Sequence, residues 1–163
     1  METVPSLRAT DTYLLSRVGK AGRRRMVDRL AGSGFSLRHM AILGYLADRG
    51  PAAQRDIGRL LGIDPSDLVG ALDELEERGL VRRERDPDDR RRHRVSLTPA
   101  GRTALRRCRR HADAVDDEVL APLTAAQRRT LSDLLGRVFD ALDADVSPPA
   151  APAPTPGTRT RRR

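Results

Sequence analysis

Tryptophan is absent from this sequence of 163 residues, and only two tyrosines and two phenylalanines are present. With so few aromatic side chains, leucine, alanine and valine must form the hydrophobic core, which favours packed helices over a β-sandwich. The single cysteine, Cys108, excludes an intramolecular disulfide and suits a reducing compartment, so we expect a cytoplasmic protein.

Long apolar runs are also missing. No stretch approaches the roughly 18 apolar residues of a transmembrane helix, and the first residues have no apolar segment typical of a signal peptide. We therefore expect no membrane partner. The sequence contains no phosphate-binding loop, nucleophile elbow or zinc-protease motif, and its three histidines lack zinc-finger spacing. We expect no metal, no cofactor and no enzymatic activity.

Arginine is the residue present in excess. Lysine and arginine total 31 against 23 acidic residues, a formal net charge of +8, and Lys20 is the one lysine. Arginine stays charged and offers a planar donor fork to phosphates and guanine edges, so the excess favours a nucleic-acid partner. Residues 146–163, rich in proline and ending in arginines, are predicted to be a disordered basic tail, and residues 1–9 a flexible arm.

The apolar spacing predicts a chain of helices before residue 80. The first begins near Thr10 or Asp11, both able to cap it, and ends at residues 32–34. Ser36 caps a second helix, which stops at Gly50, and a short helix spans 53–61. A further helix begins at Asp64 and Pro65, a favoured cap and first-turn pair, and ends in a Schellman motif at Gly79.

Two strands, about 80–85 and 92–98, follow with a loop at 86–91 between them. Thr98 and Pro99 start another helix, and Pro122 ends it. Thr124 and Gln127 form a capping box for a last helix. The helix after Thr98 carries a heptad seam and the last helix an apolar face. Both leave apolar surface that one winged helix cannot cover, which favours a dimer. The seam is formed by Leu105, Cys108, Ala112, Val115 and Val119, and the face by Leu131, Leu134, Leu135, Val138, Phe139 and Leu142.

Two helices joined by a tight turn and followed by a hairpin are typical of a winged helix-turn-helix. The expected fold class is therefore mainly α (α+β), a winged helix-turn-helix. Residues 36–98 form the predicted DNA-binding region.

The segment from Gln54 to Arg102 resembles the DNA-binding core of the MarR family of transcriptional regulators. The features that carry the resemblance are ERGLVRR, DPDDRRR and VSLTPAGR, which occur in the family's order and spacing. The resemblance implies N- and C-terminal dimerisation helices, residues 10–35 and 99–145. It implies a homodimer that binds double-stranded DNA at an inverted-repeat operator, usually as a repressor. It also implies release from DNA by a small aromatic or phenolic effector.

The loop between the two strands holds three consecutive arginines, Arg90, Arg91 and Arg92. The resemblance implies that one of them, for which we favour Arg91, enters the minor groove, where negative potential attracts arginine. Asp88 and Asp89 would brace it by ion pairing. The alternative is a solvated charge cluster, whose pairs each contribute about 0–1 kcal/mol.

The helix after Asp64 would lie in the major groove, yet its outward face has none of the Arg, Lys, Asn or Gln side chains that usually contact bases. Four acids near its end would repel phosphates. Ser66, Asp67 and Gly70 are its candidate DNA-contacting residues, although Asp67 could equally stabilise the helix dipole. Sequence specificity would then depend more on the wings and on DNA shape. Phosphate contacts are predicted for Arg38, Gln54, Arg55 and Arg83.

The first two helices hold the candidate effector residues Tyr13, Arg17 and His39. An arginine can bind a carboxylate, and a tyrosine or histidine can bind a phenol. The alternative, which we favour, is a surface arginine, a helix-start histidine and a core tyrosine. Cys108, between two arginine pairs, is either a redox-active thiol or a small core residue. A constitutive architectural DNA-binding protein without a ligand remains the alternative function.

Overall fold

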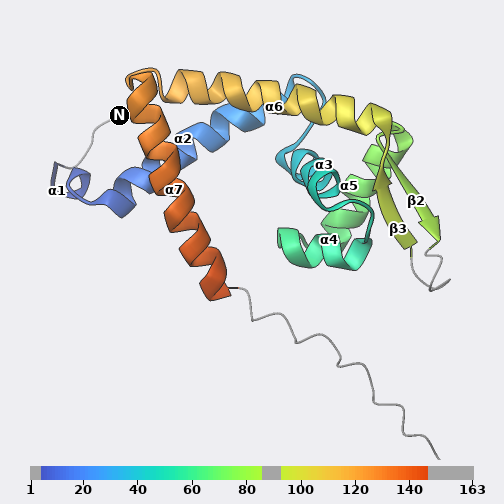
Figure 1. The fold of residues 1–163 in the computed structure, drawn as a ribbon. Helices are drawn as coiled ribbons and strands as arrows, with labels where there is room; N and C mark the ends of the chain where they lie inside the picture. The colour runs from blue at the N-terminus through green and yellow to red at the C-terminus, as the bar shows by residue number, and fades with distance from the viewer. Residues whose placement is uncertain (1–4, 86–92, 147–163) are drawn as a thin grey trace, which may run out of the picture. The chain divides into compact units, whose positions relative to one another are not determined.

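The computed structural model describes residues 5–85 and 93–146 (Figure 1). The chain divides into two compact units, residues 1–121 and residues 122–163. The first contains α1 (Pro5–Arg8), α2 (Asp11–Ala31), α3 (Leu37–Arg49), β1 (Ala52–Ala53), α4 (Gln54–Leu61), α5 (Pro65–Glu77), β2 (Val81–Arg85), β3 (His93–Leu97) and α6 (Pro99–Val119). The second contains α7 (Ala125–Val146).

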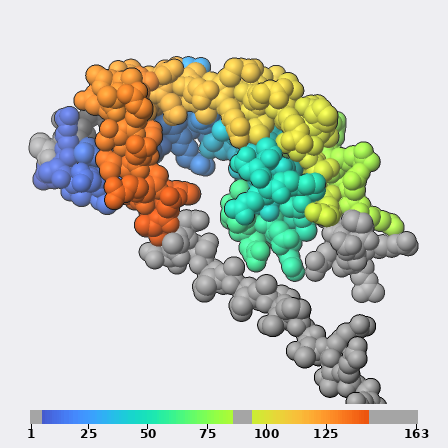
Figure 2. Space-filling view, in the orientation of Figure 1, coloured from blue at the N-terminus to red at the C-terminus, as the bar shows by residue number. Residues whose placement is uncertain are grey.

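The predicted winged helix-turn-helix is confirmed: the chain is mostly helical, with one small antiparallel sheet. No helix in the described part of the chain is both long and apolar enough to cross a membrane. In the space-filling view, α3, α4 and α5 form one continuous body beside the strands (Figure 2).

The N-terminal segment differs from the predicted flexible arm. Residues Pro5–Arg8 form a helical turn, and the backbone N–H of Thr10 donates to the Leu7 carbonyl at 3.0 Å. Proline is favourable at a first helical position because its missing N–H costs no hydrogen bond there. Helix α2 then begins at Asp11, although the Thr10 side chain makes no capping hydrogen bond to any described residue.

The sheet has three strands in the order β1-β3-β2, all antiparallel, whereas the sequence predicts two. The missed strand β1 pairs Ala52 with Val95 and Ala53 with Arg94. Two alanines between a proline and a helix give no alternation to recognise, so this strand is set by its partner β3 rather than by its own sequence. It ties the start of α4 to the wing.

Helix α5 has the predicted start and stop. The Asp64 side chain accepts from the backbone N–H of Ser66, and Pro65 occupies the first turn. At the other end, the N–H of Leu80 donates to the Leu75 carbonyl at 2.8 Å, with Gly79 at φ 66°. This is the Schellman pattern, which a positive φ at glycine makes possible without strain.

The core lies where α3, α4, α5 and β3 meet α6. Ile42, Leu43, Ile57, Leu72 and Val95 are fully buried there. The large apolar side chains of α2 differ in burial: Leu30 is fully buried at its C-terminal end, whereas four others are exposed. The exposed ones are Leu14, Leu15, Val18 and Val27.

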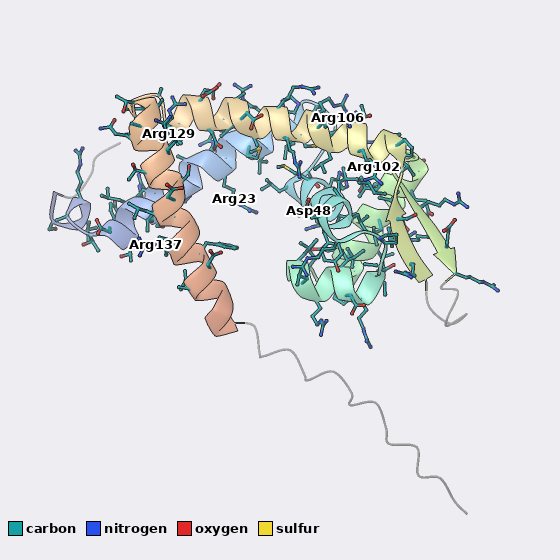
Figure 3. The ribbon with its side chains drawn as sticks, viewed as in Figure 1. Arg23, Asp48, Arg102, Arg106, Arg129 and Arg137 are labelled. Carbon is teal, nitrogen blue, oxygen red and sulfur yellow. The ribbon has the colours of Figure 1, made fainter. Side chains whose placement is uncertain are left out.

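The heptad seam of α6 corrects one expectation. Leu105, Cys108 and Val115 are buried within the protomer, along a helix that packs against α2 and α3, so most of the seam is already covered without a partner. The basic side chains of α6, Arg102 and Arg106 among them, are exposed on its surface (Figure 3).

Helix α7, taken by itself, presents the apolar face that the sequence predicts. The capping box is present, with the Thr124 N–H donating to Gln127 Oε1 at 2.9 Å and the Gln127 N–H to Thr124 Oγ1 at 3.3 Å. Phe139 is 67% exposed, and the other large apolar side chains are similarly open. These are Leu134, Leu135, Val138 and Leu142.

Candidate nucleic-acid interface

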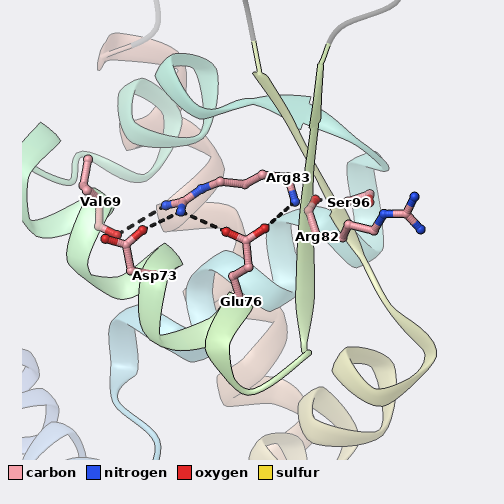
Figure 4. A network of polar contacts seen from close by, with 6 residues as sticks. All are labelled: Val69, Asp73, Glu76, Arg82, Arg83 and Ser96. Atoms are coloured by element: carbon pink, nitrogen blue, oxygen red, sulfur yellow. Dashed lines mark hydrogen bonds and ion pairs between the residues drawn. The ribbon is translucent and has the colours of Figure 1, made fainter.

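Helix α5 is the candidate recognition helix, and Arg83 of the neighbouring strand β2 folds onto it (Figure 4). The Arg83 guanidinium pairs with Asp73 and with Glu76, the latter through Nη1 and Oε2 at 3.0 Å. The backbone N–H of Arg83 donates to the other Glu76 oxygen at 2.8 Å, and Nη2 reaches the Val69 carbonyl at 3.5 Å. The side chain is only 19% exposed.

In the protein without DNA, Arg83 is engaged by Asp73 and Glu76, and its phosphate contact stays a prediction. Two carboxylates of α5 attract its guanidinium away from solvent, and sequence spacing cannot reveal that attraction because strand and helix meet only in the folded chain. Arg82, the preceding residue on β2, points away from this network and pairs with Glu84 (Figure 4).

Helix α3 contacts α5 through two further pairs. Arg38 Nη2 lies 2.9 Å from Asp67 Oδ2, and His39 Nε2 lies 3.1 Å from Glu74 Oε2. Four of the acids on α5 are therefore matched by basic side chains of α3 and β2. Two guanidinium groups, Arg38 and Arg83, therefore offset part of the negative charge of α5, while Ser66, Val69 and Gly70 are exposed on this helix.

The first turn of α5 lies beside the start of α4. Gln54 and Arg55 line a groove of about 760 Å³ together with Asp64 and Pro65. Hydrogen bonds from the Ser66 hydroxyl, at 2.6 Å, and from its backbone N–H lower the pKa of Asp64. The structure thus brings Gln54 and Arg55 to this helix end. The Asp64 carboxylate also accepts from the Ser66 N–H, to which a phosphate would otherwise bind.

The wing tip lies outside the described residues. Arg90, Arg91 and Arg92 and the bracing residues Asp88 and Asp89 all fall in the segment 86–92. The strands on either side are placed, with Arg85 opposite His93 at the last pair of the ladder. The DNA contacts of this tip remain a prediction.

The three candidate effector residues do not come together within one protomer. Tyr13 and Arg17 are neighbours on α2, with the guanidinium 6.0 Å from the ring centroid. His39 instead contacts Phe35, whose N–H bonds to the last turn of α2 at Leu30. Leu30 lies thirteen positions after Arg17 along α2, a rise of about 20 Å.

Both ring nitrogens of His39 have protein partners. The Ser36 N–H donates to Nδ1 at 3.4 Å, so the neutral ring carries its proton on Nε2 and donates it to Glu74. The Ser36 hydroxyl accepts from the His39 N–H at 3.1 Å, which completes a capping box. This arrangement favours the helix-start role of His39 over effector binding.

Protonation of His39 is expected to destabilise the fold. Burial lowers the pKa of His39, and the nearby charges of Arg78 and Arg38 add to that effect against the attraction of Glu74. A group with a lowered folded-state pKa binds more protons when unfolded, so stability falls as pH drops from about 6.5 towards the folded-state value. Thermal melts between pH 7.5 and 5.5 should show this loss, and His39→Asn should flatten it. If the melting temperature of His39→Asn falls as steeply with pH as that of the wild type, groups other than His39 cause the loss.

Cys108 is fully buried on α6. Burial raises the pKa of its thiol, an effect that the charges of Arg107 and Arg78 only partly oppose. A protonated, inaccessible thiol is a poor nucleophile, so the structure favours the core alternative over a redox sensor. Among the described residues, no group of three or more histidine, cysteine or acidic side chains could hold a metal ion.

Comparisons with known proteins agree with this architecture. A family model described as "MarR family" matches residues 33–92. The transcriptional regulator HosA of Escherichia coli O111:H- is 32% identical over 101 residues, which is 62% of this chain and 75% of HosA. Two other curated relatives, 34% and 32% identical, are matched over only 59% and 66% of their own lengths.

Two solved structures extend the likeness. Rv2887 of Mycobacterium tuberculosis, solved in complex with DNA, is 28% identical, with a TM-score of 0.70 over 80% of this chain and 98% of that one. CouR of Rhodococcus jostii RHA1, solved with bound p-coumaroyl-CoA, is also 28% identical. Its TM-score is 0.69 over 91% of this chain and 99% of that one.

Proposed function

The chain belongs to the MarR family of transcriptional regulators, and on that premise we propose that it is a homodimeric repressor released from DNA by a small ligand. Membership also confirms the expectation that it is not an enzyme. The observation that carries the proposal is the pairing of the acids on α5 with side chains of α3 and β2, which reduces the electrostatic obstacle to placing this helix in the major groove.

DNA contact would then involve three parts of the chain. Ser66, Gly70 and, after exchange of its Arg38 partner, Asp67 would face base edges from α5. Arg38, Gln54 and Arg55 surround the first turn of α5 and would contact phosphates. The wing-tip arginines would enter the adjacent minor groove. The Rv2887 complex supports this proposal because a protein of the same fold was solved on DNA.

A second copy of the chain is the proposed partner of the exposed apolar side chains on α2 and α7. Apolar patches of this extent are unusual on monomers and commonly mark interfaces. Residues 10–35 and 99–145 would form the dimer contact and hold two winged helices one DNA turn apart, which requires an inverted-repeat operator.

An effector would act by favouring one of two spacings of the winged helices. It needs a differential affinity of about 1–3 kcal/mol between DNA-competent and incompetent dimers. A small aromatic or phenolic ligand is the class that the family resemblance suggests, and the p-coumaroyl-CoA complex of CouR supports it. Tyr13 and Arg17 remain candidates on α2, while His39 is the weakest of the three.

A constitutive architectural DNA-binding protein is the second candidate. The exposed face of α5 favours it, because Ser66, Val69 and Gly70 offer few of the side chains that discriminate bases. The two functions differ in DNA preference, since an architectural protein would bind most sequences with similar affinity at a given salt concentration.

Selection of random DNA by the full chain tests the proposal. We expect enrichment of one inverted repeat, bound at least about a thousandfold more tightly than unrelated DNA. Phe139→Asp should convert the dimer to a monomer in light scattering and abolish operator binding, because a charge would be placed in the apolar interface. Gln127→Glu, a polar change on the same helix, is the control. Equal affinity for all sequences would establish the architectural function, and a dimeric Phe139→Asp protein would contradict the interface.

A further inference from the structure

Phe35, in the turn between α2 and α3, is flanked by two arginines. It is 4% exposed, and the guanidinium carbons of Arg78 and Arg107 lie 4.1 and 4.9 Å from its ring centroid. Arg78 Nη1 donates to the Gly34 carbonyl at 2.6 Å and Arg107 Nη2 to the Ser33 carbonyl at 3.3 Å. Stacking and a backbone bond therefore fix both cations in place.

These side chains border a surface hollow of about 350 Å³. Arg78 comes from the end of α5, and Arg107 and Arg110 come from α6. Thr103, Arg107 and Arg110 are four and three residues apart, a spacing that places them on one face of a helix. The apolar part of the wall is formed by Leu80, Ala100 and Ala104.

The positive charge of this hollow is not neutralised by nearby acids. Elsewhere in the same unit arginines pair with carboxylates, such as Arg29 with Glu118 and Arg38 with Asp67. Within residues 5–85 and 93–146, no carboxylate lies within ion-pair distance of Arg78, Arg107 or Arg110, and none lines the hollow.

We propose that this hollow binds a small organic anion, with its carboxylate between Arg107, Arg110 and Arg78 and its apolar body against Leu80 and Ala104. Guanidinium forks match carboxylates in geometry, and donors fixed before binding lose little entropy when the ligand arrives. A volume of about 350 Å³ lies within the range of small-molecule sites. The Thr103 hydroxyl already donates to the Pro99 carbonyl at 3.2 Å and accepts from Arg106 at 2.8 Å, so the arginines are the donors available to the ligand.

Binding here would reach the recognition helix directly. Arg78 is the C-terminal cap residue of α5, and Arg107 lies on α6, so one anion held by both would join the end of α5 to α6. This regulatory role rests on the proposed function: a carboxylate ligand bound in the hollow would alter the position of α5. It is separate from Tyr13 and Arg17, which lie near the other end of α2.

Titration calorimetry on the full chain, with benzoate as the probe, tests the site. Benzamide, of similar shape but without charge, and inorganic phosphate, without an apolar body, are the comparison ligands. We expect benzoate to bind at least tenfold more tightly than either, and Arg110→Ala to weaken benzoate at least tenfold. Arg107→Ala should do the same, with its melting temperature measured because it also removes the contact with Phe35. Arg102→Ala, another exposed arginine of α6 (Figure 3), should leave the affinity unchanged.

Each contrary result has a distinct meaning. Wild-type affinity for benzoate in Arg110→Ala and Arg107→Ala would overturn the site, and equal binding of benzamide or phosphate would overturn the proposed ligand chemistry. Weakened DNA binding by ligand-free Arg110→Ala would make these arginines DNA contacts instead. Benzoate that binds the wild type without reducing operator affinity would overturn the regulatory role. Failure of the proposed function would appear separately, as the absence of a preferred operator in the DNA selection.

Discussion

Arg83→Ala is expected to weaken operator binding by about tenfold to a hundredfold, although Arg83 itself is turned away from solvent. The substitution leaves Asp73 and Glu76 without their cation on a helix that is proposed to lie beside phosphates. Electrophoretic mobility shifts on the selected operator measure the loss. The free energy of unfolding should also fall by about 1–3 kcal/mol, because charge-assisted hydrogen bonds are lost.

Two further variants separate this indirect effect from a direct phosphate contact. Arg82→Ala removes an equal charge from the neighbouring position, where the side chain is 70% exposed, and should change the affinity much less. Adding Asp73→Asn and Glu76→Gln to Arg83→Ala should restore binding, since the repelling carboxylates are then gone. If the triple variant binds as poorly as Arg83→Ala, Arg83 contacts DNA directly, as its sequence position predicts.

Gly101→Ala is expected to give the largest loss of stability. A Cβ at this position would clash with the Leu80 carbonyl oxygen and lie 2.6 Å from Leu97 Cδ1. The Leu80 carbonyl cannot move freely, because it accepts from the Thr98 N–H at 3.1 Å and from the Thr98 hydroxyl at 3.0 Å. Overpacking against fixed backbone costs about 3 kcal/mol or more, so the melting temperature should fall by roughly 6–12 °C.

Gly44→Ala is the matched control for that change. Gly44 also lies in a helix, but none of the described residues comes within 4 Å of an added Cβ. Alanine is the better helix former by about 1 kcal/mol, so Gly44→Ala should leave the melting temperature equal or higher. A Gly101→Ala protein that melts with the wild type would show that α6 can shift relative to the start of β2 at little cost.

Local signals in the sequence predict helix boundaries well. Asp64, Pro65 and Gly79 define α5 because capping and turn preferences depend on a few adjacent residues. Thr98 and Thr124 mark the starts of α6 and α7 for the same reason. The motifs ERGLVRR and VSLTPAGR identify the family, and the order of elements they imply is the order that the structure has.

Contacts between residues that are distant in sequence explain the features that the sequence does not predict. The sequence shows an acidic recognition helix and an arginine on the next strand, but only the folded chain pairs Arg83 with Asp73 and Glu76. Strand β1 exists because β3 offers it a partner. The hollow at Phe35 is a further example. The spacing of Thr103, Arg107 and Arg110 predicts that they share one face of α6, but Arg78 comes from another helix. The sequence by itself determined the elements, the family and the excess of positive charge. Tertiary structure decided where that charge remains available, because ion pairing depends on distances that the order of residues does not state.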